Sequence, residues 1–475
     1  MKLFKKKELP QVEPVKIKPL FGMRPGLWLT IAYAIGFVLL LFLIGFLPDI
    51  VHGSKRVSFT SAADNAAVYV DGQYAGGTPF TRKIESGIHE VSYRVNGIEL
   101  DNLTVKVGHP VFFNWLFPRH MSVKSSAVLN REAFTALTKE FLTDVSAYSA
   151  VLEYDTVHRY PQLFTQYAKS ISTSSFASEL DAFRAALLFI TTDEMYEDAK
   201  AAMDILKVSF PLSYEKLDGK TTGTADAEAP AVTAKKTDLK AGEMTIEGFT
   251  ISAAKFSNGK QTAATYPEMI TAGNTVETAQ FNIGTYCVTE NQFARFLAAN
   301  PQWSLENKDS LIAQGLVDEY YLDGVITSLS STTVRPVRNV SYYAAEAFCK
   351  WLSQISGRNV FLPDENQWIA ACLSDKNPGY QRSLLPSEPE GVPSAMLGGV
   401  WEMTGSAFIP LSRISDADDV AKARAILSEN GTPADIVLKG GSYVSSNYRT
   451  IDCYTMGTAY RSLCSDYMGF RIAWN

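Results

Sequence analysis

The residues of this chain that could carry redox, acid–base or metal chemistry are divided between its two halves. The histidines all precede the cysteines: His52, His89, His109, His120 and His158, then Cys287, Cys349, Cys372, Cys453 and Cys464. A C-terminal half without histidine cannot build a Ser-His-Asp triad, a Cys-His pair or a His-ligated zinc or iron site unless another domain donates a ligand. The chemistry available there is that of thiols, hydroxyls and carboxylates.

The length and the charge balance narrow the classes of function further. The 475 residues predict about three domains at roughly 150 residues each. Hydrophobic residues make up 46% and charged residues 20%, a composition that builds packed cores rather than a disordered polymer. With 44 basic against 50 acidic side chains and a net charge of -6, the chain has no excess of positive charge to neutralise phosphates. This balance argues against a nucleic-acid partner.

An apolar segment from residue 27 to residue 47 predicts a single transmembrane helix. Its 21 residues contain no charged side chain and no Asn, Gln or His, and at about 1.5 Å per residue they span roughly 30 Å, the thickness of a bilayer's hydrocarbon core. A cleaved signal peptide is the alternative, but its apolar region runs about 7–15 residues and ends at small residues, unlike Phe46-Leu47-Pro48-Asp49. We therefore expect an uncleaved membrane anchor.

The flanks of this segment predict its orientation. Basic residues are concentrated before it: Lys2, Lys5, Lys6, Lys7, Lys16, Lys18 and Arg24 precede it, and Lys55 and Arg56 follow. The positive-inside rule places residues 1–26 as a basic tail in the cytoplasm and the rest of the chain outside it. The expected location is the inner (cytoplasmic) membrane, with the bulk of the chain in the periplasm, where disulfides are permitted.

Residues 57–107 alternate in polarity between turn dipeptides and predict a small all-β sandwich. Asp71-Gly72 and Asn96-Gly97 are strong hairpin signals. The segment AAVYVDGQYAGGTPF, followed by IESGIHEVSYRVNGIE, resembles the PEGA domain family, although Ala63-Asp64-Asn65-Ala66 replaces the four letters that name it. Since that family is extracytoplasmic and has no catalytic residues, the resemblance implies an interaction or spacer module.

From residue 126 to residue 210 the apolar residues recur at helical spacing instead of alternating with polar ones. Asn130 can cap a helix whose apolar residues recur every three or four positions, and two further stripes follow, which predicts an antiparallel bundle. Residues 215–243 contain no aromatic side chain and are rich in Ala, Thr, Lys, Gly and Asp. This composition predicts a flexible linker that lets the last domain move relative to the membrane-proximal part.

From residue 244 to residue 475 the chain resembles formylglycine-generating enzymes, the sulfatase-modifying factor family. Five blocks occur in the family's order: FNIGTYCVTENQF, PVRNVSYYAAEAFCKWLSQISGRNVFLPDENQW, GGVWEMT, GGSY and GFR. The resemblance implies the family's variant of the C-type-lectin-like fold, an α+β, loop-rich architecture. It also implies the family's reaction, in which copper(I) and oxygen convert a substrate cysteine to formylglycine.

The ligands for that reaction are missing from this chain. The family holds copper(I) between two cysteines that lie five positions apart, soon after the Gly-Gly-Ser block, and Cu(I) selects sulfur ligands. Counted from Gly441-Ser442-Tyr443, the two positions are occupied by Ser445 and Thr450, and no two cysteines of the chain are five positions apart. Copper is therefore not expected, and the domain is predicted to be non-catalytic.

The resemblance also implies two further site assignments. In some family members a non-catalytic cysteine pairs with the cysteine of the block that contains Cys349, and Cys453 occupies a matching position, so a Cys349–Cys453 disulfide is expected, with free buried thiols as the alternative. Glu402 matches a calcium ligand of the family, but Gly399 replaces an Asn of the same motif. A calcium site needs about 6–8 oxygen ligands, so calcium is a weak candidate cofactor, and Glu402 can instead bridge loops within the core.

Together these features predict a membrane-anchored, non-enzymatic protein of the bacterial cell envelope that uses a PEGA-like module and a degenerate enzyme-like domain for binding or as a scaffold. Its expected partners are the membrane and an envelope protein or glycan, and the oligomeric state stays open. The alternative is an oxidoreductase with rearranged cysteines, built from Cys453, Cys464 and scattered carboxylates. The cysteine spacing disfavours an authentic formylglycine-generating enzyme.

Overall fold

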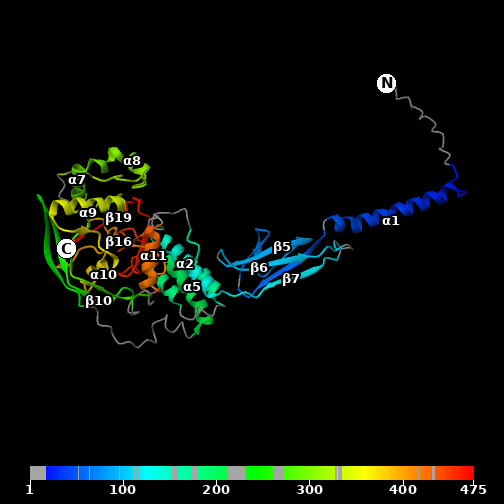
Figure 1. Ribbon diagram of the computed structural model, residues 1–475, viewed down its shortest axis with the longest axis horizontal. Helices are drawn as coiled ribbons and strands as arrows, with labels where there is room; N and C mark the ends of the chain where they lie inside the picture. The colour runs from blue at the N-terminus through cyan, green and yellow to red at the C-terminus, as the bar shows by residue number, and fades with distance from the viewer. Residues whose placement is uncertain are drawn as a thin grey trace, which may run out of the picture. The chain divides into compact units, whose positions relative to one another are not determined.

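The computed structural model describes residues 18–51, 53–63, 65–95, 97–110, 114, 117–151, 159–172, 180–211, 231–260, 271–326, 329, 334–415, 417–429 and 434–475. The chain divides into two compact units, Met1–Ala127 and Val128–Asn475. The first unit contains one long helix and a β-sandwich, and the second is a larger assembly of helices and strands (Figure 1).

Helix α1 (Pro25–Val51) is the apolar helix expected from the sequence. Its stretch Pro25–Leu47 is long and apolar enough to cross a membrane, and none of it is buried within the protein. An anchor and a signal sequence share these properties, so the structure confirms the apolar helix itself. Residues 1–17 of the predicted cytoplasmic tail lie outside the described residues.

The β-sandwich of the first unit has two sheets, with the strand orders β4-β1-β7 and β3-β2-β5-β6. The strands are β1 (Ser54–Ser61), β2 (Ala67–Val70), β3 (Gln73–Gly77), β4 (Phe80–Glu85), β5 (Gly87–Val95), β6 (Ile98–Val107) and β7 (His120–Ser125). Asp71 and Gly72 have positive φ angles and form the predicted turn between β2 and β3. The Tyr93 hydroxyl of β5 donates to the Val123 carbonyl of β7 at 3.1 Å, so the sandwich extends beyond residue 107, where the sequence prediction ended.

The second unit begins with the helical layer, which we define as residues 131–209. Its elements are α2 (Arg131–Val151), α3 (Leu163–Ile171), α4 (Asp181–Ala186), η2 (Leu187–Phe189) and α5 (Asp193–Ser209). Asn130 caps α2 as predicted, because its side-chain oxygen accepts from the Ala133 N–H at 2.7 Å. The Asp198 carboxylate of α5 accepts from the Phe164 N–H at 2.9 Å and thereby ties α3 to α5.

The helical layer packs directly on the enzyme-like domain. The Thr458 hydroxyl donates to the Ser146 carbonyl of α2 at 3.0 Å, and the Arg184 guanidinium of α4 donates to the Thr271 carbonyl at 3.3 Å. The helices and the last domain therefore form one compact unit, and the movement of the last domain relative to the membrane-proximal part stays a prediction.

Part of the predicted linker 215–243 is a strand of the enzyme-like domain. β8 (Ala234–Ala241) pairs antiparallel with β9 (Met244–Ile251) along its whole length, through a turn in which Gly242 has a φ of 61°. Leu239 and Ala241 of β8 are buried, while most of its other side chains are not. β8 lies at the edge of its sheet, so its polar composition reflects one solvated face. Residues 215–230 of the predicted linker lie outside the described residues.

The enzyme-like domain is built around two larger sheets, with the strand orders β13-β20-β12-β9-β8 and β18-β17-β16-β19. Beyond β8 and β9, its strands are β10 (Ala254–Ser257), β11 (Thr275–Thr278), β12 (Phe281–Gly284), β13 (Val360–Phe361), β14 (Tyr380–Gln381), β15 (Leu397–Gly398), β16 (Trp401–Ala407), β17 (Ile436–Lys439), β18 (Met456–Ala459), β19 (Met468–Phe470) and β20 (Ala473–Trp474). Its helices are α7 (Glu290–Ala299), η3 (Pro301–Trp303), η4 (Leu305–Asn307), α8 (Lys308–Ala313), α9 (Tyr342–Ser356), α10 (Glu365–Leu373) and α11 (Ala417–Glu429).

Capping residues from the recognised sequence blocks start the main helices of this domain. Thr289 and Gln292 form a capping box at α7, Asp364 and Gln367 form another at α10, and the Ser341 side chain caps α9. The apolar side chains of α7 and α9 pack in a core with β16, β17 and β19, whereas α10 packs in a second core with β9 and β12. The α+β class predicted for this part of the chain is confirmed.

Candidate functional site

Ser445 and Thr450, the two positions that the sequence resemblance assigns to the copper ligands, lie in one buried loop. Ser445 is 3% exposed, and its side-chain oxygen accepts a hydrogen bond from the Ser442 N–H at 2.9 Å. The Ser445 N–H donates to the Ser442 carbonyl at 3.1 Å, which closes a tight turn. The hydroxyl of Ser445 therefore shapes the loop that follows Gly441.

Thr450, the second position, is covered by the helical layer. Its side chain is buried, and its hydroxyl lies 2.9 Å from the Asn447 carbonyl oxygen and 3.4 Å from the Ile190 carbonyl oxygen. Ile190 directly follows η2, so the layer that precedes the enzyme-like domain closes this position to solvent. A substrate peptide would have to displace the helical layer before it could reach Thr450.

The predicted Cys349–Cys453 disulfide is not present, because all five cysteines are free thiols. Cys349 lies in the core that contains Phe348, whereas Cys453 lies in the second core together with Cys372. A hydrogen bond to Cys453, and then burial, raise the pKa of Cys372 well above its usual value. The structure thus places the two cysteines of the predicted pair in different cores, because spacing along the chain does not tell which core a cysteine enters.

Three of the other thiols also have raised pKa values. Burial raises the pKa of Cys349 and of Cys464, and burial together with the nearby Glu402 carboxylate raises the pKa of Cys287. A thiol with a raised pKa stays protonated near neutral pH, whereas the thiolate is the form that binds a metal ion. The structure therefore brings no pair of thiolates to the loop of Ser445 and Thr450.

Glu402, the weak calcium candidate, is the centre of a buried ion pair. Its carboxylate lies 2.6 Å from the Arg471 guanidinium and accepts a hydrogen bond from the Trp368 indole N–H at 2.8 Å. Burial alone would lower the pKa of Arg471, but the Glu402 carboxylate reverses this effect and raises it. Arg471 also donates to the Gly284 and Ser394 carbonyls at 3.0 and 2.9 Å. Glu402 thus fills the alternative role, in which it bridges segments of the core.

A second buried charge cluster lies behind Cys372 and Cys453. Lys439 is fully buried, lies 3.6 Å from the Glu365 carboxylate and donates to the Tyr454 carbonyl at 3.0 Å. Arg413 also pairs with Glu365, so one carboxylate serves two cations. Desolvation lowers the pKa of Lys439. Every charged group of this cluster has a protein partner, which indicates a structural rather than a catalytic network.

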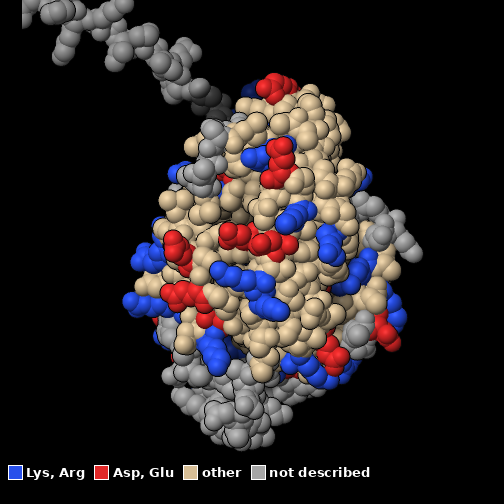
Figure 2. All heavy atoms as spheres, turned by 90° about the vertical axis from the view of Figure 1, so that its left-hand side faces the viewer, with Lys and Arg blue, Asp and Glu red and all other residues tan. Residues whose placement is uncertain are grey.

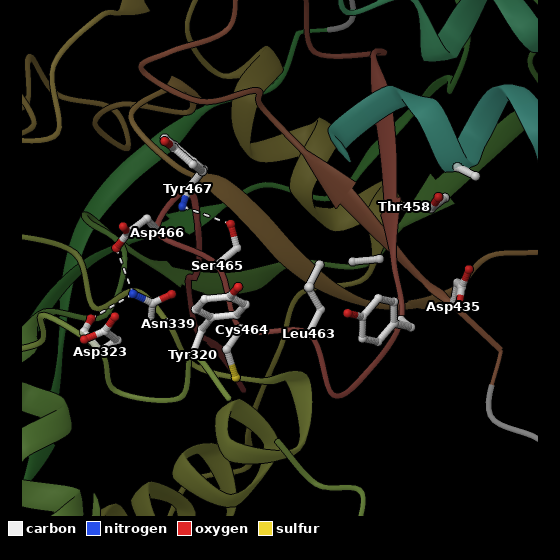
Figure 3. A pocket seen from close by; sticks show the side chains of 13 residues that line it. Tyr320, Asp323, Asn339, Asp435, Thr458, Leu463, Cys464, Ser465, Asp466 and Tyr467 are labelled. Atoms are coloured by element: carbon white, nitrogen blue, oxygen red, sulfur yellow. Dashed lines mark hydrogen bonds between the residues drawn. The ribbon is translucent and has the colours of Figure 1, made fainter. Parts of the chain in front are cut away.

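The enzyme-like domain has an open cavity of about 490 Å³ that sequence reasoning missed (Figure 3). Tyrosine and aspartate side chains line it, together with Asn339, Leu463 and Cys464. The lining residues come from α2, the loop between α8 and α9, Asp435 directly before β17, β18, and the loop between β18 and β19, so no continuous motif encodes the cavity. The local signal closest to it is the aromatic and acidic run YRSLCSDY, which is separated from the GFR block by Met468 alone.

The described residues contain no further candidate metal centre, and one face of the protein shows no continuous basic area. No group of three or more His, Cys, Asp or Glu side chains is arranged there to hold a metal ion. On the face shown in Figure 2, basic and acidic side chains are intermixed without a continuous basic area. A phosphate backbone is bound by clustered Lys and Arg, so nothing on this face points to a nucleic-acid partner.

Family models match two parts of the chain. Residues 54–107 match the PEGA domain, and residues 233–388 match the sulfatase-modifying factor enzyme 1-like domain. Both domains occur in the predicted order, and both resemblances inferred from the sequence motifs are confirmed. The second match begins at residue 233, next to the start of β8, in agreement with the place of that strand in the enzyme-like domain.

The proteins to which this chain is similar are distant in sequence. An uncharacterised protein of Borreliella burgdorferi is 20% identical over 495 residues, with 96% of this chain and 96% of that protein covered. Among solved structures, Treponema denticola variable protein 1 matches with a TM-score of 0.36 and 12% identity over 50% of this chain and 98% of its own. PvdO from Pseudomonas aeruginosa (TM-score 0.32, 16% identity) and CarF (TM-score 0.30, 13% identity) each match 52% of this chain and 100% and 97% of their own.

Proposed function

We propose that this chain is a membrane-anchored, extracytoplasmic protein of the bacterial envelope whose enzyme-like domain binds a partner without catalysing formylglycine formation. The proposal rests on the side chains at the two positions that the resemblance assigns to copper ligands and on their burial. Hydroxyl side chains replace both thiolates, and Thr450 lies beneath the helical layer with its hydroxyl 3.4 Å from the Ile190 carbonyl oxygen. A site that lacks its metal ligands and its access route has no means of carrying out the reaction.

The location rests on α1 and on the charges that precede it. Seven basic residues lie before the apolar helix, which favours a cytoplasmic N-terminus and an inner-membrane anchor. The PEGA domain that follows it supplies a β-sandwich with no buried charged side chain among its described residues. Such a module suits a spacer or interaction role, and we infer an envelope protein or a glycan as the partner of the whole chain.

The catalytic question is tested with full-length protein in a mild detergent. The protein is incubated with Cu(I), oxygen and a peptide of the C-x-P-x-R type, and mass spectrometry is used to look for conversion of the peptide cysteine to an aldehyde. We expect no conversion. Turnover that is lost in Cys453→Ala and kept in Cys287→Ala would contradict the proposal and would support the alternative, an oxidoreductase with rearranged cysteines.

The proposed topology is tested with alkaline phosphatase fused after residue 125, at the end of β7. The fusion should be active, because this enzyme folds only where disulfides form. A matched fusion in which Lys5, Lys6 and Lys7 are replaced by Glu should lose part of that activity, because the positive-inside signal is weakened. An inactive fusion in the natural sequence background would overturn the extracytoplasmic assignment.

A further inference from the structure

The open cavity of the enzyme-like domain has the size of a ligand site. Its volume of about 490 Å³ falls within the range of roughly 300–1,000 Å³ that is usual for small-molecule pockets. Its lining includes neither Ser445 nor Thr450. Asn339 and Cys464 are buried on its floor, and Tyr320 is exposed at its rim.

The side chain of Asn339 is the first sign of a ligand. Asn339 is 4% exposed, and its amide nitrogen donates to the Asp323 carbonyl oxygen and to the Asp466 carboxylate, both at 2.8 Å. These two bonds fix the orientation of the amide, and its oxygen then points toward the cavity (Figure 3). No side chain or backbone group that the structure describes donates to this oxygen. An acceptor oxygen that faces the cavity without a protein donor favours a ligand that carries N–H groups.

The charges around the cavity favour a cation. Asp323, Asp435 and Asp466 line it, and no Lys, Arg or His does. Asp466 is partly neutralised by Arg338 at 3.2 Å, which lies outside the lining. Asp435 has no cationic partner in the described part of the chain, and desolvation raises its pKa. An ammonium group would provide the missing positive charge beside Asp435.

The arrangement of the carboxylates points to an elongated ligand. Figure 3 shows Asp435 on one side of the cavity and Asp323 and Asp466 on the other, with Tyr320 and Leu463 between them. Leucine and tyrosine side chains offer an apolar surface for a chain of methylene groups, and the faces of tyrosine rings attract cations. Two acidic ends joined by an apolar middle match a molecule with a positive charge at each end.

We propose that this cavity binds a linear organic dication, a diamine or polyamine, with one ammonium group beside Asp435 and the other beside Asp466 and the amide oxygen of Asn339. The proposal deepens the binding role given above and rests on it. A sugar fits less well, because its hydroxyl groups need donors as well as acceptors and the lining is dominated by acceptors. An anion is repelled by the three carboxylates.

Isothermal titration of the full-length protein in a neutral detergent tests this proposal. The probes are 1,5-diaminopentane and spermidine, compared with pentylamine and 1,5-pentanediol as matched ligands with one charge and none. We expect the dications to bind at least about tenfold more tightly than pentylamine, since one charge-assisted hydrogen bond contributes about 1.5–3 kcal/mol. The diol should not bind measurably.

Two variants of the protein test whether the diamine binds in this cavity. Asp435→Asn should weaken binding of 1,5-diaminopentane about tenfold, by the same loss of one charged contact. Asp238→Asn, which removes an exposed carboxylate of β8 outside the cavity, should leave it unchanged. Three results would each overturn the proposal. The two variants could have equal effects, or the dication and the monocation could bind with equal affinity. The protein could also bind a lysine-rich peptide but no free diamine. Aldehyde formation in the assay above would instead overturn the proposed function, so the two failures are distinguishable.

Discussion

The β-sandwich of the first unit and the enzyme-like domain of the second unit differ in where they keep their charges. Among the described residues of the sandwich, the buried polar side chains are all neutral: Ser54, Thr78, Ser92, Asn114 and Ser125. The second unit buries charged groups of both signs: Asp198, Glu290, Glu402, Arg413, Lys439 and Arg471. The ionic contact of the sandwich between His89 and Asp71 lies instead at its surface.

This difference separates two ways of stabilising a domain. The sandwich has alternating strands with an apolar core, so almost any apolar residue of similar volume can replace another there. The enzyme-like domain has few long regular elements, and its loops are held to each other by buried ion pairs whose partners lie far apart along the chain. Glu402 and Arg471, which belong to the GGVWEMT and GFR blocks, are an example. In this chain, therefore, two residues of the recognised blocks form an ion pair that holds distant segments of the fold together.

The strongest test of this contrast is the replacement Arg471→Met. It leaves the Glu402 carboxylate buried without its cation, and breaking a buried pair in this way costs about 3–5 kcal/mol. The free energy of unfolding of the second unit should fall by that amount in urea titrations followed by tryptophan fluorescence. Arg94→Met, the matched change in the sandwich, removes the exposed contact with Glu99 and should cost less than about 1 kcal/mol.

A double variant sharpens this prediction. Arg471→Met together with Glu402→Leu removes both charges, so no unpaired carboxylate stays buried and part of the lost stability should return. A double variant that is less stable than Arg471→Met alone would show that the contacts of Glu402 with Trp368 and Cys287 matter more than its pairing with Arg471.

A smaller effect is expected from Cys372 and Cys453, which lie in the same core and whose interaction raises the pKa of Cys372. In an oxidising compartment they should form a disulfide, and its loss in Cys372→Ser should cost about 2–4 kcal/mol. Mass spectrometry of non-reduced peptides from envelope fractions should show Cys372 linked to Cys453. Cys464→Ser is the matched control, because Cys464 lies in the other core. Peptides that link Cys349 to Cys453 would restore the pairing expected from the sequence.

The elements that the sequence predicted correctly are those with a local periodic signal. The apolar run predicts α1. The alternation of polar and apolar residues around Asp71-Gly72 predicts β2 and β3, and the capping residue Asn130 predicts the start of α2. β8 was missed because only Leu239 and Ala241 of its residues are buried, so an edge strand with a polar face has the composition of a linker.

The features that could not be predicted depend on the distant parts of the chain that meet in space. The thiol neighbour of Cys453 is set by which core α10 enters, and the cavity joins α2 to loops that lie more than a hundred residues further along. The covering of Thr450 by Ile190 has the same origin, because these residues are 260 positions apart. The sequence predicts that the two thiolates are replaced by Ser445 and Thr450, but it carries no signal that the helical layer covers Thr450.

The smallest expected effect concerns the surface pair of the sandwich. His89 Nδ1 lies 2.7 Å from Asp71 Oδ2, and His89 Nε2 lies 3.0 Å from the Glu85 carbonyl oxygen, so both ring nitrogens face acceptors. The hydrogen bond with Asp71 raises the pKa of His89, and the same bond lowers the pKa of Asp71. This pair contributes stability while both groups are charged, and because it is exposed the contribution is at most about 1 kcal/mol.

The sign of the pH dependence follows from these two shifts. The raised pKa of His89 means that its contribution is complete below the unfolded value of about 6.5 and is lost as the pH rises through the higher folded value. The lowered pKa of Asp71 means that its contribution is present above about pH 3.9 and is lost as the pH falls through the lower folded value.

Hydrogen exchange of β2 and β5, corrected for the intrinsic rate, should therefore be faster at pH 8.5 than at pH 5.5 in the natural sequence. His89→Gln should abolish this difference, whereas His120→Gln, at an exposed position of β7, should preserve it. If both variants change the pH dependence of hydrogen exchange equally, that dependence belongs to the sandwich as a whole and not to His89. The contrast between surface and buried ion pairs would then be supported by the Arg471 variants alone.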